Sequence, residues 1–226
     1  MESRDDNPSK ILQDYFMSEL WNRRPLESRQ KKWAQKAAAF LARTKISPNM
    51  ISIASIAFAA LSFWMYFLAI NSALEWLCLL LAAVFIQLRL LCNLMDGMVA
   101  IEHHRRSKLG DLYNEIPDRL SDLLIIMGVG VYCWGQPYAL SLAWFTAALA
   151  IFTAYLRILG ASLGTPHFFS GPMAKPHRMA LITAITLLQM FLPSIPVLYF
   201  SLYLMVIGIL ITCYRRLRKI TKALKQ

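Results

Sequence analysis

The chain has 226 residues, of which 57% are hydrophobic and only 16% are charged, and its formal net charge is +11. This composition excludes an ordinary soluble domain and is typical of an integral membrane protein. A basic excess fits either nucleic acid or an anionic membrane surface, and the long apolar runs favour the membrane. We therefore expect no nucleic-acid partner.

Residues 1–45 form a charged leader that we predict to be cytoplasmic. Its last part, RQKKWAQKAAAFLARTK at residues 29–45, has apolar residues at helical spacing and a basic opposite face. This pattern predicts an amphipathic helix lying on the membrane surface among membrane lipids. Generic anchoring by positive charge explains it better than recognition of a specific lipid.

Six apolar segments follow, each of which predicts a membrane-spanning helix. They cover residues 46–70, 73–95, 112–134, 138–160, 179–192 and 195–213. Ser47 is the expected N-cap of the first helix, with Pro48 at its first helical position. The predicted fold is all-α: a six-transmembrane-helix bundle over residues 46–214, preceded by the amphipathic surface helix and followed by a basic cytoplasmic tail at 215–226.

Lysine and arginine are distributed unevenly among the links between these segments. The links near Asn71, Gln136 and Ser194 carry none, whereas the two other links and both termini are basic. The positive-inside rule therefore places both termini in the cytoplasm. We expect a multi-pass protein of a bacterial-type inner (plasma) membrane.

Carboxylates are concentrated at the predicted cytoplasmic ends of the second and third segments. Asn93 and Asp96 share a helix face, and a second polar stripe follows at steps of three and four. The stripe comprises Asp111, Asn114, Glu115, Asp118 and Asp122. Two such faces on adjacent helices provide oxygen ligands for a hard divalent cation. A carboxylate inside an apolar segment is costly, which favours a functional site over solvated helix-end charges.

The spacing of these residues resembles the motif of the CDP-alcohol phosphotransferases (CDP-alcohol phosphatidyltransferases), D-x2-D-G-x2-A-R-x8-G-x3-D-x3-D. The matching residues are Asn93, Asp96, Gly97, Ala100, Ile101, Gly110, Asn114 and Asp118, and Ser107 matches a common family serine. The stretches ISPN, AYLRILGASLG and GPMAKPHRM are also similar to family sequences. The resemblance extends from about residue 46 to residue 214.

The resemblance implies an enzyme of phospholipid biosynthesis that transfers a substituted phosphate from a CDP-alcohol to a second alcohol and releases CMP. It implies that Asp118 is the general base and that Mg2+ or Mn2+ is held by Asn93, Asp96, Asn114 and Asp118. It assigns the CDP moiety to Gly97, Ala100, Ser107 and Gly110. It assigns an anionic acceptor to Arg157, Lys175 and Arg178. We expect CDP-diacylglycerol as donor, a small acceptor such as glycerol 3-phosphate or another polyol, and a homodimer.

The departures from the motif leave alternatives open. Asn93 and Asn114 replace two aspartates and remove two negative charges, which leaves one metal ion in place of two, or two held weakly. Asp111, Glu115 and Glu102 are candidates to compensate, although Glu115 leaves its helix about 100° away from Asn114. Arg89 could pair with a carboxylate of the cluster or extend to the cytoplasmic interface, and we expect the pairing.

Two other functions compete with the enzyme. A catalytically degenerate member would act as a lipid- or nucleotide-binding membrane protein, which metal-dependent CMP release distinguishes. A small transporter is disfavoured, because its charges would lie near mid-membrane along a path.

Overall fold

The computed structural model describes residues 31–44, 46–102 and 109–225, with only the backbone at positions 101, 102 and 111. All regular structure in these ranges is helical, which confirms the all-α class. The helices are α2 Lys32–Arg43, α3 Pro48–Ala69, α4 Glu75–Glu102, α5 Gly110–Tyr132, α6 Ala139–Ser162, α7 Lys175–Phe191 and α8 Val197–Leu224.

Helices α3 to α8 each overlap one of the six predicted apolar segments. Within the described ranges, α3, α4, α6 and α8 are long and apolar enough to cross a membrane. Helix α7 has 17 residues, and α5 begins with a charged half. The six-span count therefore stays a prediction. The Ser47 hydroxyl accepts the backbone N–H of Met50 at 3.2 Å with Pro48 next in the chain, which confirms the predicted start of α3.

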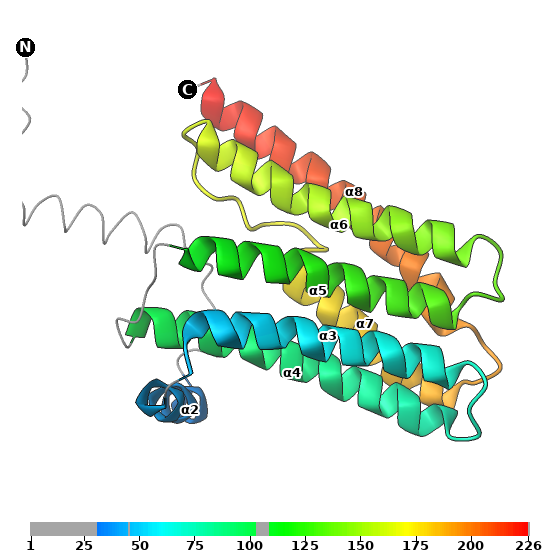
Figure 1. Cartoon of the computed structure of the whole chain (residues 1–226). Helices are drawn as coiled ribbons and strands as arrows, with labels where there is room; N and C mark the ends of the chain where they lie inside the picture. Colours follow the sequence, from blue (N-terminus) through cyan, green and yellow to red (C-terminus); the bar gives the residue numbers. More distant parts are fainter. Residues whose placement is uncertain (1–30, 45, 103–108, 226) are drawn as a thin grey trace, which may run out of the picture.

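The six long helices form a closed ring of neighbours (Figure 1). Around the ring, α3 packs on α4, α4 on α7, α7 on α8, α8 on α6, α6 on α5, and α5 on α3. Helices that are distant in sequence, such as α4 and α7, therefore lie side by side. This order brings the carboxylates of α4 and α5 close to the basic N-terminus of α7.

Small residues allow the helices to approach closely. Ser52, Ser55, Ala59 and Ser62 are all buried along one face of α3, which packs on α4 and α5. At Gly130 of α5 an added Cβ would collide with Ala143 of α6. Close helix approach at small residues is a usual source of packing in membrane bundles.

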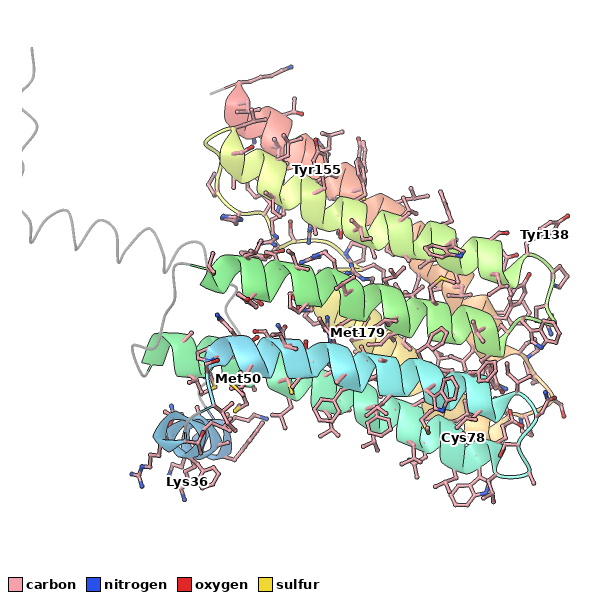
Figure 2. The ribbon with its side chains drawn as sticks, viewed as in Figure 1. Lys36, Met50, Cys78, Tyr138, Tyr155 and Met179 are labelled. Atoms are coloured by element: carbon pink, nitrogen blue, oxygen red, sulfur yellow. The ribbon has the colours of Figure 1, made fainter. Side chains whose placement is uncertain are left out.

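The loops without lysine or arginine gather at one end of the bundle. Ile70, Gln136 and Ser194, from the α3–α4, α5–α6 and α7–α8 connections, line one shared hollow. Helix α2, which carries Lys36, lies at the opposite end from Tyr138 (Figure 2). The two ends of the bundle therefore differ in charge as the positive-inside pattern predicts.

Helix α2 lies within residues 29–45, for which the sequence predicts an amphipathic helix, and both its amphipathic character and its location on a membrane surface stay predictions. Ala34 and Ala38 are buried against a cluster that includes Leu94 and Met98 of α4. Trp33 and Phe40 remain exposed.

Two helices are longer than the hydropathy windows that predicted them. Helix α4 continues past Met95 to Glu102, and α8 continues past Cys213 to Leu224, through the residues assigned to a basic tail. Hydropathy falls where charged residues begin, whereas the helical hydrogen bonds continue. Asp96 and Gly97 therefore lie on an unbroken helix.

Candidate active site

A cavity of about 490 Å³ opens among five helices of the ring, at the end where α2 packs. Its volume is typical of a small-molecule site. Polar side chains from α4, α5, α6, α7 and α8 converge on it. They are Gln87, Asn93, Asp96, Asn114, Glu115, Asp118, Arg119, Thr153, Arg157, Lys175, Arg178 and Arg216.

The structure brings the four predicted metal residues to this one cavity. The Asn93 side-chain amide donates to Asp118 Oδ1 at 3.0 Å and to Asn114 Oδ1 at 3.3 Å, which links α4 to α5. The i, i+3 and i, i+4 spacing therefore predicted the correct face of each helix. Their roles as ligands stay predictions.

Asp96 is 5% exposed and is held by neutral donors. The Ser52 hydroxyl of α3 donates to its Oδ2 at 2.6 Å, and the backbone N–H of Gly97 donates to its Oδ1 at 2.5 Å. Ser52 was not singled out in the sequence. The only local signal is its place in the row of small residues on α3.

Lys175, the first residue of α7, lies between the two polar helix faces. Its Nζ donates to Asn93 Oδ1 at 2.6 Å and forms an ion pair with Asp118 Oδ2.

Below the cavity, Asp122 is buried between two arginines. Arg89 Nη2 of α4 lies 2.9 Å from Asp122 Oδ1, and Arg178 Nη2 of α7 lies 2.7 Å from Asp122 Oδ2. Arg89 also reaches Asp118 Oδ1 at 3.4 Å, which confirms its predicted pairing with the cluster. We call Arg89, Asp122 and Arg178 the buried ion cluster. Asp122 thus serves packing and is not among the residues that line the cavity.

Glu115 does not join the predicted metal residues. It forms ion pairs with Arg157 of α6 and, at 2.8 Å, with Arg119 one turn along α5. Arg157 also lies over the ring of Phe169, 5.4 Å from its centroid. Glu115 thus neutralises arginines and does not replace the charge lost at Asn114.

Arg216 is a lining residue that sequence analysis missed. It is 5% exposed, and its guanidinium donates to the carbonyls of Thr153 at 2.5 Å and Ser170 at 3.2 Å. These bonds attach the α6–α7 connection to α8. Its place in a polybasic run concealed it, although buried Thr212 and Ile220, four residues away on either side, mark the same helix face.

The predicted CDP-contacting residues are placed unequally. Gly97 lines the cavity, whereas Ala100 and Gly110 are half-buried and are not among its described lining residues. Ser107 lies outside the described residues, as do the side chains of Glu102 and Asp111. No group of three or more His, Cys, Asp or Glu that could hold a metal occurs within the described ranges.

Comparisons with known proteins agree with the motif. The sequence model of the CDP-alcohol phosphatidyltransferase family matches residues 45–214. Archaetidylinositol phosphate synthase of Aeropyrum pernix is 32% identical over 160 residues, which cover 70% of this chain and 75% of that protein.

Among solved structures, phosphatidylinositol phosphate synthase of Mycobacterium tuberculosis with CDP-DAG bound has a TM-score of 0.71 at 17% identity, over 84% of this chain and 94% of that one. The same synthase in complex with manganese and citrate has a TM-score of 0.70 at 18% identity, over 83% and 88%. At such identities the likeness establishes a common fold.

The buried ion cluster generates a stability prediction. Arg89→Met leaves Asp122 with one cationic partner, and breaking a buried pair typically costs about 3–5 kcal/mol. Arg119→Met removes an i, i+4 pair with partly exposed Glu115, typically worth about 0.3–0.5 kcal/mol. Thermal unfolding in one detergent should therefore show a large loss for Arg89→Met and a small one for Arg119→Met. Equal losses would contradict the assigned role of Arg89.

Proposed function

This chain belongs to the CDP-alcohol phosphatidyltransferase family, and we propose that it transfers a phosphatidyl group from CDP-diacylglycerol to a hydroxyl of a phosphorylated polyol. Family membership makes it an enzyme of phospholipid biosynthesis that uses a CDP-linked lipid. One observation supports the finer proposal most: a single cavity combines an oxygen-ligand wall at Asp96 with a cationic wall at Arg157 and Arg216.

The donor proposal rests on the apolar part of the cavity. Leu90, Leu91 and Leu94 of α4 line it together with Trp33 of α2. These side chains offer a surface for acyl chains beside the polar residues. The Mycobacterium tuberculosis synthase of the same fold has CDP-DAG bound. We accordingly propose CDP-diacylglycerol, with Gly97 beside the CDP moiety.

The acceptor proposal rests on charge. Five cationic and three carboxylate side chains line the cavity. A cationic excess suits a phosphorylated acceptor, and guanidinium groups bind phosphate in bidentate fashion. We propose that Arg157, Lys175 and Arg216 face this phosphate, while Arg178 positions Asp122. The Aeropyrum pernix relative is named for an inositol phosphate lipid. We therefore propose an inositol phosphate as a candidate acceptor in addition to glycerol 3-phosphate.

The polar residues fit a divalent cation at Asp96. Carboxylate and amide oxygens are ligands that Mg2+ and Mn2+ accept, and Asp96 and Asn114 offer them within one cavity. When bound, the cation would neutralise phosphate oxygens of the donor. Manganese is present in one structure of the Mycobacterium tuberculosis synthase.

The chemical step that we propose uses Asp118 as general base. The acceptor hydroxyl oxygen attacks the phosphorus that carries the diacylglycerol, the bond from this phosphorus to CMP breaks, and the hydroxyl proton passes to Asp118. The Asn93 amide and Lys175 hold the Asp118 carboxylate at the cavity surface. Lys175 is also placed to face a phosphate.

We further propose that α3 to α8 all cross the membrane, with both termini, α2 and the cavity on the cytoplasmic side of a bacterial-type inner membrane. The clustering of the uncharged loops at the other end supports this orientation. We also propose a homodimer, which the mass of the detergent-purified protein would check.

The proposed function is tested with purified protein, CDP-diacylglycerol and a panel of acceptors that includes glycerol 3-phosphate, an inositol phosphate and the unphosphorylated polyols. We expect CMP release and a new phospholipid only with a phosphorylated acceptor. Tight cytidine-nucleotide binding without CMP release would instead indicate a catalytically degenerate binding protein.

Asp118→Asn should lower turnover by about 100- to 10,000-fold, because it removes the general base but keeps the side-chain shape. Cytidine-nucleotide affinity should change little. Glu75→Gln is the matched control. Glu75 is the first residue of α4, far from the motif in the sequence, and its Oε1 accepts a hydrogen bond from the Tyr132 hydroxyl at 2.5 Å. Removing the charge of Glu75 should leave turnover intact. Near-normal turnover in Asp118→Asn would exclude Asp118 as the base.

Metal dependence provides another prediction. Chelation with EDTA should abolish CMP release, and Mg2+ or Mn2+ should restore it. Asp96→Ala should abolish release at any metal concentration, because Asp96 is the one motif carboxylate of α4. Full activity in the presence of chelator would rule out the metal mechanism.

Topology is tested by cysteine labelling in intact cells with a membrane-impermeant maleimide. Gln136→Cys should react from outside, and Lys36→Cys should react only after the membrane is permeabilised. The wild type supplies the background of the four native cysteines, which are buried or half-buried. External labelling of Lys36→Cys with a protected Gln136→Cys would reverse the proposed orientation.

A further inference from the structure

Lys175 occupies the space between the two metal-motif faces. Its Nζ contacts one oxygen from each face: Asn93 Oδ1 of α4 at 2.6 Å, and Asp118 Oδ2 of α5 in an ion pair. These are two of the four side chains that the motif offers to metal ions. An ammonium group already coordinates them as a metal ion would.

The remaining atoms of Asn93 and Asp118 are also engaged. The Asn93 amide donates to Asp118 Oδ1 at 3.0 Å, and Arg89 Nη2 lies 3.4 Å from the same oxygen. The Asp118 carboxylate is thus bonded by two cationic groups and one amide. It has little negative charge left to attract a further cation, and Lys175 would repel one placed beside it.

Asp96 differs from Asp118 in the donors that it faces. Its described hydrogen bonds come from the Ser52 hydroxyl and the Gly97 backbone N–H, and both donors are neutral. Neither donor carries a positive charge that would offset the Asp96 carboxylate through direct contact. Asn114 lies on the cavity lining with an exposed side chain. Its Oδ1 accepts from the Asn93 amide at 3.3 Å and keeps a second lone pair for a cation.

Resting on the metal dependence in the proposed function, we propose that the Lys175 ammonium group takes the place of one divalent cation, so that the chain binds a single divalent ion beside Asp96 and Asn114. Asn93 then acts as a ligand of the ammonium group. Its neutral amide can accept from Lys175 and donate to Asp118 at once, which an ionised aspartate cannot do. This explains why asparagine stands at that motif position.

The proposal is tested by counting Mn2+ ions with isothermal titration calorimetry and by electron paramagnetic resonance of the bound ion. Wild type should bind one Mn2+ per chain with the spectrum of an isolated ion. Asn93→Asp/Asn114→Asp, which restores both motif aspartates but keeps Lys175, should still bind one. Adding Lys175→Met should admit a second Mn2+ and produce the spectrum of a spin-coupled pair.

Lys36→Met in the same Asn93→Asp/Asn114→Asp background is the matched control. It removes the same charge from an exposed position on α2 and should leave one Mn2+ per chain. A second ion in this control would show that net charge, and not the position of Lys175, sets the number. Elution volume and helical circular dichroism establish that each variant is folded.

The number of Mn2+ ions bound by the wild-type protein is sufficient by itself to overturn the proposal, whatever the variants bind. Two spin-coupled Mn2+ ions per wild-type chain, or none, would contradict it, and so would a folded Lys175→Met triple variant that binds only one. CMP release from the same preparations separates the two hypotheses. Two ions with CMP release would refute the role of Lys175 and keep the function, whereas one ion without CMP release from any acceptor would refute the function alone.

Discussion

The buried ion cluster is the constraint on which the rest of the site depends. Asp122 on α5 is 2% exposed and binds Arg89 of α4 and Arg178 of α7, which are 0% and 1% exposed. Buried charges are stable only when they are paired with good geometry. The three helices must therefore keep their mutual positions for all three charges to remain paired. Asp118 precedes Asp122 by four residues on α5. The same ion pairs therefore fix the position of Asp118 relative to α4 and α7.

Arg178 and Arg216 extend this constraint to the other wall of the cavity. Arg178 donates to the carbonyl of Met173 at 2.9 Å, and the Met173 N–H donates to Thr212 of α8 at 3.0 Å. Arg216 binds the carbonyls of Thr153 and Ser170. The last part of the α6–α7 connection, at Ser170 and Met173, is thus held in place, and Lys175 follows directly from this fixed backbone. The backbone thus fixes the point from which the long Lys175 side chain reaches into the site.

Local patterns predicted much of the fold and part of the site. Apolar runs located six helices, and spacing placed Asn93 with Asp96 and Asn114 with Asp118 on shared faces, because both signals depend on neighbours within two turns. Ser52, the position of Lys175 and the bonds of Arg216 depend on contacts across 44, 57 and 63 residues. No single-sequence periodicity contains such pairings. The C-terminal ends of α4 and α8 were placed too early for a different reason. A hydropathy window ends where charged residues begin, whereas both helices continue through those residues.

Charge balance links the asparagines of the motif to the proposed chemistry. The cavity lining carries two more cationic than carboxylate side chains. Under the proposed function it receives the two anionic phosphates of the donor and a phosphate monoester of about −1.5 to −2 charge. One divalent cation brings the charges of site and substrates close to neutrality, whereas a second would leave a buried positive excess. Aspartate at positions 93 and 114 would suit two metal ions. Asparagine at both, with Lys175 between the helices, suits one.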